Sequence, residues 1–266
     1  MNTTELMAGK RGLIMGVANN HSIAWGIAEA CHAHGAELAF TYQGEAFGKR
    51  VKPLAESVGA AACLPCDVDS DDSIAQTFAD LGKVWDKFDF VVHAIAYSDK
   101  EELKGRYVDT TRSNFKHTLD ISCYSFTAVA KYAEPMLNPG GSLITLSYEG
   151  AQRVMPSYNV MGVAKAALEA SVRYLAVDLG RNGIRVNALS AGPMRTLAGS
   201  AIAGARFTYN WQGKSSPLGR NIELEEVGNS ALYLLSDMSA GVTGEVHYVD
   251  SGYHLVGMAI PAGGDE

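Results

Sequence analysis

Short apolar runs alternate with amphipathic stretches along almost all of the 266 residues. The apolar runs predict seven strands, over residues 11–15, 37–42, 60–66, 89–95, 142–146, 184–190 and 245–249. The stretches between them predict helices over 22–34, 45–57, 70–84, 157–181 and 223–235, and a long helix within 114–136. Strands separated by helices form parallel sheets, and strands that are apolar throughout are covered on both faces. The pattern therefore predicts a doubly wound α/β fold with about seven parallel strands and helices on both faces.

One segment, residues 191–221, departs from this alternation. It is rich in Gly and Pro, with large apolar residues between them, and it follows the sixth strand. Long segments without a clear element are uncommon except as lids or binding loops, and ligands of such sheets bind beyond the carboxyl ends of the strands. We therefore expect an apolar substrate lid over about 192–221, which is compatible with a pair of short helices closing the core. No linker interrupts the rest, so a single domain over 1–266 is expected, with a mobile tail over about 261–266.

Composition and charge exclude several classes of protein. The apolar fraction of 47% is too high, and the net charge of −7 too small, for a disordered chain. No apolar run approaches the ~18 residues that span a bilayer. The N-terminal residues lack the basic n-region and apolar h-region that are typical of a signal peptide, and 22 basic against 29 acidic residues leave no footprint for nucleic acid. We expect a cytoplasmic protein that binds neither membrane nor nucleic acid. Charged residues make up only 19%, which suggests that some surface does not face water.

Cysteine and carboxylate clusters are better explained by structure than by chemistry. Cys63 and Cys66 have the spacing of a redox dithiol, but they fall within or at the end of an apolar run that predicts a buried strand. The acidic residues of 67–72 suit the start of a helix, where the dipole favours them. A metal site there is the weaker reading, and no metal is expected. His93, within a strand, is expected to be a packed core histidine.

The first strand leads into a glycine turn and then a helix, from Gly16 to Ser22. Backbone N–H groups at such a helix start can hold a pyrophosphate. Ala18 and His21 stand where the standard dinucleotide motif has its later glycines, so the spacing alone is a weak signal. Its position at the first strand–helix junction favours a Rossmann-type nucleotide site. Ser22 can cap the helix and offer its hydroxyl to phosphate.

The end of the second strand indicates the nucleotide. Gln43 can hydrogen-bond a ribose hydroxyl, and Glu45 would repel a 2′-phosphate. These residues favour NADH as the cofactor. Lys49 and Arg50 lie one turn further along and leave NADPH open as the less favoured choice.

Tyr158 and Lys165 form the strongest catalytic candidate. Seven residues on a helix rise by ~10 Å and return to the same face, so one ligand along that face can touch both. A phenol is a weak acid, with a pKa of about 10, and a nearby ammonium is expected to lower that pKa and ease proton donation. Spacing alone does not exclude an exposed helical Tyr and Lys; the Ala- and Gly-rich helix after the fifth strand favours the catalytic reading.

These residues resemble the short-chain dehydrogenase/reductase superfamily, and more closely its bacterial NADH-dependent enoyl-[acyl-carrier-protein] reductases. The resemblance runs from about Lys10 to Met258. It rests on Gly16-x5-Ser22-Ile23-Ala24-x-Gly26, Tyr148-x9-Tyr158-x6-Lys165, Tyr158-Asn159-Val160-Met161-Gly162, the run from Ser190 to Ala198, and Val249-Asp250-Ser251-Gly252-Tyr253.

The resemblance implies reduction of the carbon–carbon double bond of trans-2-enoyl-acyl-carrier-protein thioesters with NADH in fatty-acid elongation. Tyr158 would stabilise the enolate, Lys165 would bind the nicotinamide ribose, and Tyr148 would stand near the position of a Ser in ketone-reducing relatives. The implied substrate residues are Ser98, Tyr148, Tyr158 and Met161. The implied cofactor residues are Gly16, Ser22, Ile23, Gln43, Asp67, Val68, Ile95, Lys165, Met194, Arg195, Thr196, Leu197 and Ala198. The implied partners are an acyl carrier protein and copies of the chain, as a homotetramer.

Two alternatives stay open. A short-chain-type reductase of carbonyl or 3-oxoacyl thioesters would share the fold and the Tyr–Lys pair. A non-catalytic nucleotide-binding protein would bind cofactor without turnover.

Overall fold

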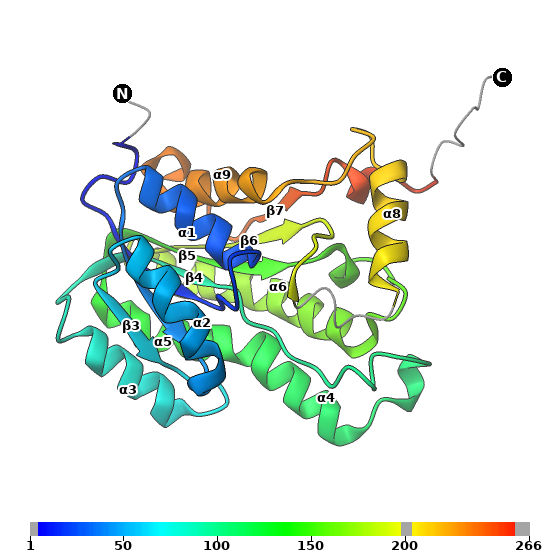
Figure 1. The fold of residues 1–266 in the computed structure, drawn as a ribbon, viewed down its shortest axis with the longest axis horizontal. Helices are drawn as coiled ribbons and strands as arrows, with labels where there is room; N and C mark the ends of the chain where they lie inside the picture. Colours follow the sequence, from blue (N-terminus) through cyan, green and yellow to red (C-terminus); the bar gives the residue numbers. More distant parts are fainter. Residues whose placement is uncertain (1–4, 198–203, 259–266) are drawn as a thin grey trace.

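Seven parallel strands form one sheet in the part of the chain that the structure, a computed structural model, describes: residues 5–197 and 204–258. The strands are β1 (Arg11–Met15), β2 (Glu37–Tyr42), β3 (Ala62–Pro65), β4 (Phe88–His93), β5 (Leu137–Ser147), β6 (Arg185–Ala191) and β7 (Val246–Val249). Their order is β3-β2-β1-β4-β5-β6-β7 (Figure 1). The strand order reverses between β1 and β4, and ligands of open α/β sheets bind at such a point. The predicted sheet is confirmed.

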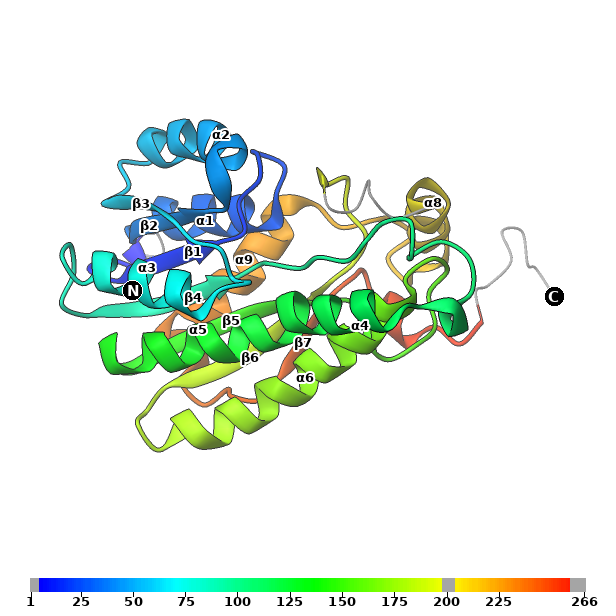
Figure 2. The same cartoon turned by 90° about the horizontal axis from the view of Figure 1, so that it is seen from below.

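Helices cover both faces of this sheet. The helices are α1 (Ile23–Ala33), α2 (Gly44–Ser57), α3 (Asp71–Leu81), α4 (Arg112–Leu119), α5 (Ser125–Ala133), α6 (Asn159–Gly180), α8 (Ala205–Ser215) and α9 (Leu224–Leu235). Figure 1 shows α1 and α9 on one side of the sheet, and Figure 2 shows α4 and α5 end to end, with α6 alongside them, on the other side. Helix α2 packs on the same side as α1 and α9. Alternate strand residues enter the two cores: Ile14 and Phe90 face α1 and α9, whereas Leu13 and Val91 face α5 and α6.

The predicted long helix within 114–136 is not one regular helix. Helix α4 passes into a π-helical turn over Asp120–Tyr124 and then into α5. Single π-helical turns inside α-helices are frequent at functional sites. Here Ser122, fully buried, bonds both the backbone N–H and the carbonyl of Tyr97, each at 3.0 Å. The turn therefore holds the loop that follows β4.

One sequence expectation needs correction. The sequence predicts a buried strand over 60–66, but β3 is shorter and only partly buried, because it lies at the edge of the sheet. The segment 192–221 contains helix α8, which is compatible with the short helices that the sequence allowed there. The tail over 261–266 lies outside the described residues.

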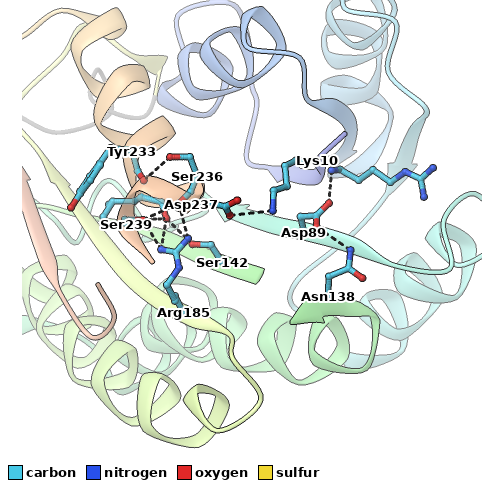
Figure 3. A network of polar contacts seen from close by, with 11 residues as sticks. Lys10, Asp89, Asn138, Ser142, Arg185, Tyr233, Ser236, Asp237 and Ser239 are labelled. Carbon is cyan, nitrogen blue, oxygen red and sulfur yellow. Dashed lines mark hydrogen bonds and ion pairs between the residues drawn. The ribbon is translucent and has the colours of Figure 1, made fainter. Parts of the chain in front are cut away.

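The amino-terminal edge of the sheet is held by a buried arginine. Arg185, at the start of β6, donates to the carbonyl of Leu234 (2.7 Å), to Ser239 Oγ (2.7 Å) and to the carbonyl of Ser236 (3.1 Å) (Figure 3). Ser142 Oγ donates to the same Leu234 carbonyl at 2.9 Å. These contacts satisfy carbonyl groups that the end of α9 leaves without helical partners. These contacts lie at the edge opposite to the carboxyl ends of the strands.

Replacing Arg185 by Met is expected to lower the free energy of unfolding by about 2–3 kcal/mol, because buried carbonyls lose charge-assisted donors. The measurement is urea unfolding at one protein concentration. Lys10→Met, which removes the more exposed Lys10–Asp237 pair at 3.2 Å, should change it by less than about 1 kcal/mol. Equal losses in both variants would contradict the assignment.

Candidate active site

Tyr158 and Lys165 lie at the start of α6, beside the carboxyl end of β5. Both are buried, exposing 7% and 6% of their surface. Lys165 Nζ donates to the carbonyl of Leu146 at 2.6 Å. The ring of Tyr158 meets that of Tyr148 edge to face, with 5.0 Å between centroids and 72° between planes. The structure therefore places all three predicted catalytic residues at the edge of the sheet where the fold predicts a ligand.

The backbone on either side of Tyr158 is strained. Ser157 and Asn159 have φ of 57° and 40°, in the left-handed region that costs a non-glycine residue about 1–3 kcal/mol. Asn159 Nδ2 donates to the carbonyls of Leu103 (3.1 Å) and, more weakly, of Gly105. Tyr158 also packs over Gly150, where a Cβ would approach its ring to 2.3 Å. The surrounding structure thus holds Tyr158 in one position.

Burial sets the protonation states of the pair. It raises the pKa of Tyr158 above its ordinary value, so the phenol keeps its proton at neutral pH. It lowers the pKa of Lys165 to about 8, opposed by the nearby Cys123 and Glu169. We expected the ammonium to lower the pKa of the phenol. The pKa of Tyr158 is raised instead, because desolvation first, and then the neighbouring Tyr148 and Glu169, disfavour the phenolate.

Ser147, the serine beside Tyr148, is engaged elsewhere. Its Oγ donates to Glu169 Oε1 at 2.6 Å, and Gln152 Nε2 donates to Glu169 Oε2. Glu169 exposes only 1% of its surface. Sequence reasoning missed Glu169, although its position four residues after Lys165 on one helix would have placed the two side by side.

An apolar cluster surrounds the two tyrosines. Buried Leu103, Val160 and Met161 pack with Tyr158, and Phe115, Leu119, Tyr148 and Met155 lie against them. The structure therefore brings together three of the four predicted substrate residues. The fourth, Ser98, has its hydroxyl in a network with Asn114 and Thr118, whose Oγ1 donates to it at 2.9 Å.

The glycine turn after β1 has the features of a nucleotide cradle. Gly16 has φ of +98°, and a Cβ there would lie 2.1 Å from the carbonyl oxygen of Ala94. Only glycine allows that approach, at the junction where the strand order reverses. Ser22 stands at the N-cap of α1, next to Ile23, but its side chain does not cap the helix. Instead Oγ accepts from the N–H groups of Ala18 (3.0 Å) and Asn19 (3.1 Å), and so shapes the turn.

A second group of predicted cofactor residues lies at the ends of β2 and β3. Gln43 Nε2 donates to Asp67 Oδ1 at 3.0 Å, a pairing that sequence reasoning missed. Val68 is buried beside them, and Ile95, after β4, is partly buried. Strand β2 pairs with β1, which the Gly16 turn follows. The two groups of residues can therefore hold the two ends of one dinucleotide.

The predicted cofactor run after β6 is described only in part. Met194 and Thr196 are partly buried and Leu197 is exposed. The guanidinium of Arg195 lies 4.8 Å from the ring centroid of Tyr209 on α8, which links this run to that helix. Ala198 lies outside the described residues.

A parallel seven-stranded sheet with a Tyr–Lys pair at its carboxyl edge is typical of the short-chain dehydrogenase/reductase class. The family described as Enoyl-(Acyl carrier protein) reductase matches residues 16–254. The chain is 64% identical over 253 residues to enoyl-[acyl-carrier-protein] reductase [NADH] 2 of Rhizobium meliloti (strain 1021), covering 95% of this chain and 94% of that protein.

Two solved structures are similarly close. The reductase of Anaplasma phagocytophilum, in complex with NAD, has a TM-score of 0.94 and 58% identity, covering 98% of this chain and 99% of that one. FabI of Candidatus Liberibacter asiaticus has a TM-score of 0.94 and 54% identity, covering 96% and 99%. The chain therefore belongs to the enoyl-(acyl-carrier-protein) reductase family.

The lowered pKa of Lys165 predicts a pH-dependent stability. The pKa of about 8 in the folded protein lies below the ordinary lysine pKa of 10.5. Between these values the unfolded chain binds more protons, so the free energy of unfolding rises with pH. Wild type should therefore gain stability relative to Lys165→Met as pH rises from about 8 to about 10. The measurement is urea unfolding of both proteins across that range. A constant difference between them would contradict the burial of a titrating lysine.

Proposed function

We propose that this chain reduces trans-2-enoyl thioesters carried on acyl carrier protein, with NADH as reductant, in fatty-acid elongation. The observation that carries the proposal is the buried tyrosine pair: Tyr158 retains its proton inside an apolar cluster that includes Tyr148. A site of this kind suits an apolar acyl chain whose oxygen gains negative charge during the reaction. Ser147 Oγ donates its hydrogen to Glu169 Oε1, so this hydroxyl is not available to donate to a substrate carbonyl. This favours enoyl reduction over carbonyl reduction.

The chain's own residues then have distinct roles. The bound cofactor supplies a hydride to the β-carbon of the substrate. Tyr158, which keeps its proton on Oη, donates a hydrogen bond to the thioester oxygen as that oxygen becomes an enolate. Lys165 uses one N–H on Leu146 and has two left for the ribose hydroxyls. Met161 forms part of the acyl wall.

The cofactor would lie across the carboxyl edge of β1, β4 and β5. Gly16, Ser22 and Ile23 would hold the pyrophosphate, and Gln43, Asp67 and Val68 the adenosine end. The residues closest to the nicotinamide end would be Ile95, Lys165, Met194, Arg195, Thr196, Leu197 and Ala198. The fit rests on the close approach that Gly16 permits and on the Gln43–Asp67 pair.

The reaction is tested by following NADH oxidation with crotonyl-CoA and, separately, with acetoacetyl-CoA. Oxidation is expected with the enoyl thioester and faster with NADH than with NADPH. Oxidation with acetoacetyl-CoA alone would indicate the carbonyl reductase. Binding of NADH without turnover of either would indicate a nucleotide-binding protein.

Tyr158→Phe should lower kcat by about 10²–10³-fold, because it removes one donor to the developing oxyanion. NADH affinity, measured by fluorescence titration, should stay unchanged. Tyr132→Phe is the matched control: this tyrosine on α5 stacks on Phe78, 6.3 Å between centroids. A fully active Tyr158→Phe would refute the catalytic role.

The partners follow from the same proposal. An acyl carrier protein would deliver the substrate, and the enzyme would work in the cytoplasm, where carrier-protein thioesters and NADH are both available. No helix in the two described ranges is long and apolar enough to cross a membrane. We propose one domain over residues 1–266, with the segment 192–221 acting as the substrate lid.

Exposed apolar residues favour self-association. Tyr174 and Val177, one turn apart on α6, expose 76% and 73% of their surface, and Tyr124, on the π-helical turn that packs against α6, exposes 50%. A groove of about 680 Å³ over the same turn is lined in part by Phe115 and Leu119. Apolar patches of this kind mark interfaces. A second copy of the chain is the occupant we propose, within a homotetramer.

The protein should sediment as a species larger than the 28.3 kDa chain. Tyr174→Glu combined with Val177→Glu should reduce its mass, because charges would be buried without partners at the interface. Val84→Glu, at another exposed apolar position (44%), should leave the mass unchanged. A wild-type monomer, or an unaltered double variant, would refute the interface.

A further inference from the structure

The lid helix α8 sends one polar side chain to the tyrosine pair. Gln212 Nε2 donates to Tyr148 Oη at 3.2 Å. Within α8, all of which the structure describes, only Gln212 is buried, with 2% of its surface exposed. The large apolar residues of the same helix, Phe207 and Trp211, are 62% and 49% exposed and stack on each other. An amphipathic helix usually buries its apolar side chains and exposes its polar ones. Here the polar Gln212 is buried, and the apolar Phe207 and Trp211 are exposed.

Packing alone does not explain a glutamine at this position. Gln212 Oε1 is buried without a hydrogen-bond partner among the described residues, and such a group destabilises the fold. An apolar side chain of the same size would avoid that loss. Other contacts already hold α8: Asn221 Nδ2 donates to the carbonyl of Tyr209 at 3.0 Å, and Arg195 lies over the ring of Tyr209.

The hydrogen bond determines what Tyr148 can do. With its oxygen accepting from Gln212, the hydroxyl hydrogen of Tyr148 is left to donate to another acceptor. A donor on the phenol oxygen also polarises the O–H bond and strengthens the next hydrogen bond in the chain. The contact opposes the effect of burial, which raises the pKa of Tyr148.

We propose that Gln212 is a positioning residue for the reductase reaction: it orients the Tyr148 hydroxyl as a donor beside Tyr158 and so makes the site complete only when α8 is in place. This inference rests on the proposed function. It explains why a buried amide stands on a helix whose apolar residues face outward.

The test is a double-mutant cycle between Gln212→Met and Tyr148→Phe, with kcat and KM measured for crotonyl-CoA and NADH. Gln212→Met should lower kcat by about 3–10-fold, the equivalent of one lost hydrogen bond. In the Tyr148→Phe background it should cause no further loss, because the hydroxyl on which it acts is gone. Gln76→Met, the same substitution at an exposed position of α3, is the matched control and should keep the wild-type kcat.

Each outcome decides the inference. An equal loss in both backgrounds would assign Gln212 to packing of α8, and no loss in either would also overturn the proposal. If Gln212→Met does not fold, Gln212→Ala takes its place, since Ala has the highest intrinsic helix propensity. A wild type inactive with every enoyl thioester would refute the proposed function, and this inference with it; an active wild type with an unaffected variant refutes only the role of Gln212.

Discussion

The burial of a phenol and an ammonium on one face of α6 is the constraint on which the site depends. In water both groups titrate near pH 10. Inside the protein, desolvation moves them in opposite directions, so Tyr158 holds its proton more tightly and Lys165 more loosely. The Leu146 carbonyl accepts a hydrogen bond from the buried Lys165 ammonium, and the ring of Tyr158 packs edge to face with the ring of Tyr148. The backbone is strained at Ser157 and Asn159, on either side of the phenol.

The parallel sheet separates stability from chemistry. All carboxyl ends meet at one edge, which brings the Gly16 turn and the tyrosine pair to the same side. At the opposite edge, Arg185 ties β6 to the end of α9 (Figure 3). The strained backbone at Ser157 and Asn159, and Gln212 Oε1, which has no hydrogen-bond partner among the described residues, both cost stability at the site. They can persist because the core and the Arg185 contacts stabilise the fold elsewhere.

The small share of charged residues, 19%, also has a structural account. Both faces of the sheet are covered by helices, so most strand residues are apolar. Uncharged residues are then found on outer surfaces too: Tyr174 and Val177 on α6, and Phe207 and Trp211 on α8. These surfaces lie on the helix proposed to meet another copy and on the proposed lid.

The sequence by itself determined the alternation of strands and helices along the chain and, from it, the doubly wound class. It also determined the Gly16 turn and the shared face of Tyr158 and Lys165. All of these follow from periodicity and helical spacing, which are local properties. Only the tertiary structure decided the direction of the two pKa shifts, the Gln43–Asp67 pair, the turning of Ser147 to Glu169 and the reach of Gln212 to Tyr148. Gln212 and Tyr148 are 64 residues apart, and no local pattern encodes their meeting. Desolvation and long-range hydrogen bonds depend on which segments pack together, and that is a property of the folded chain.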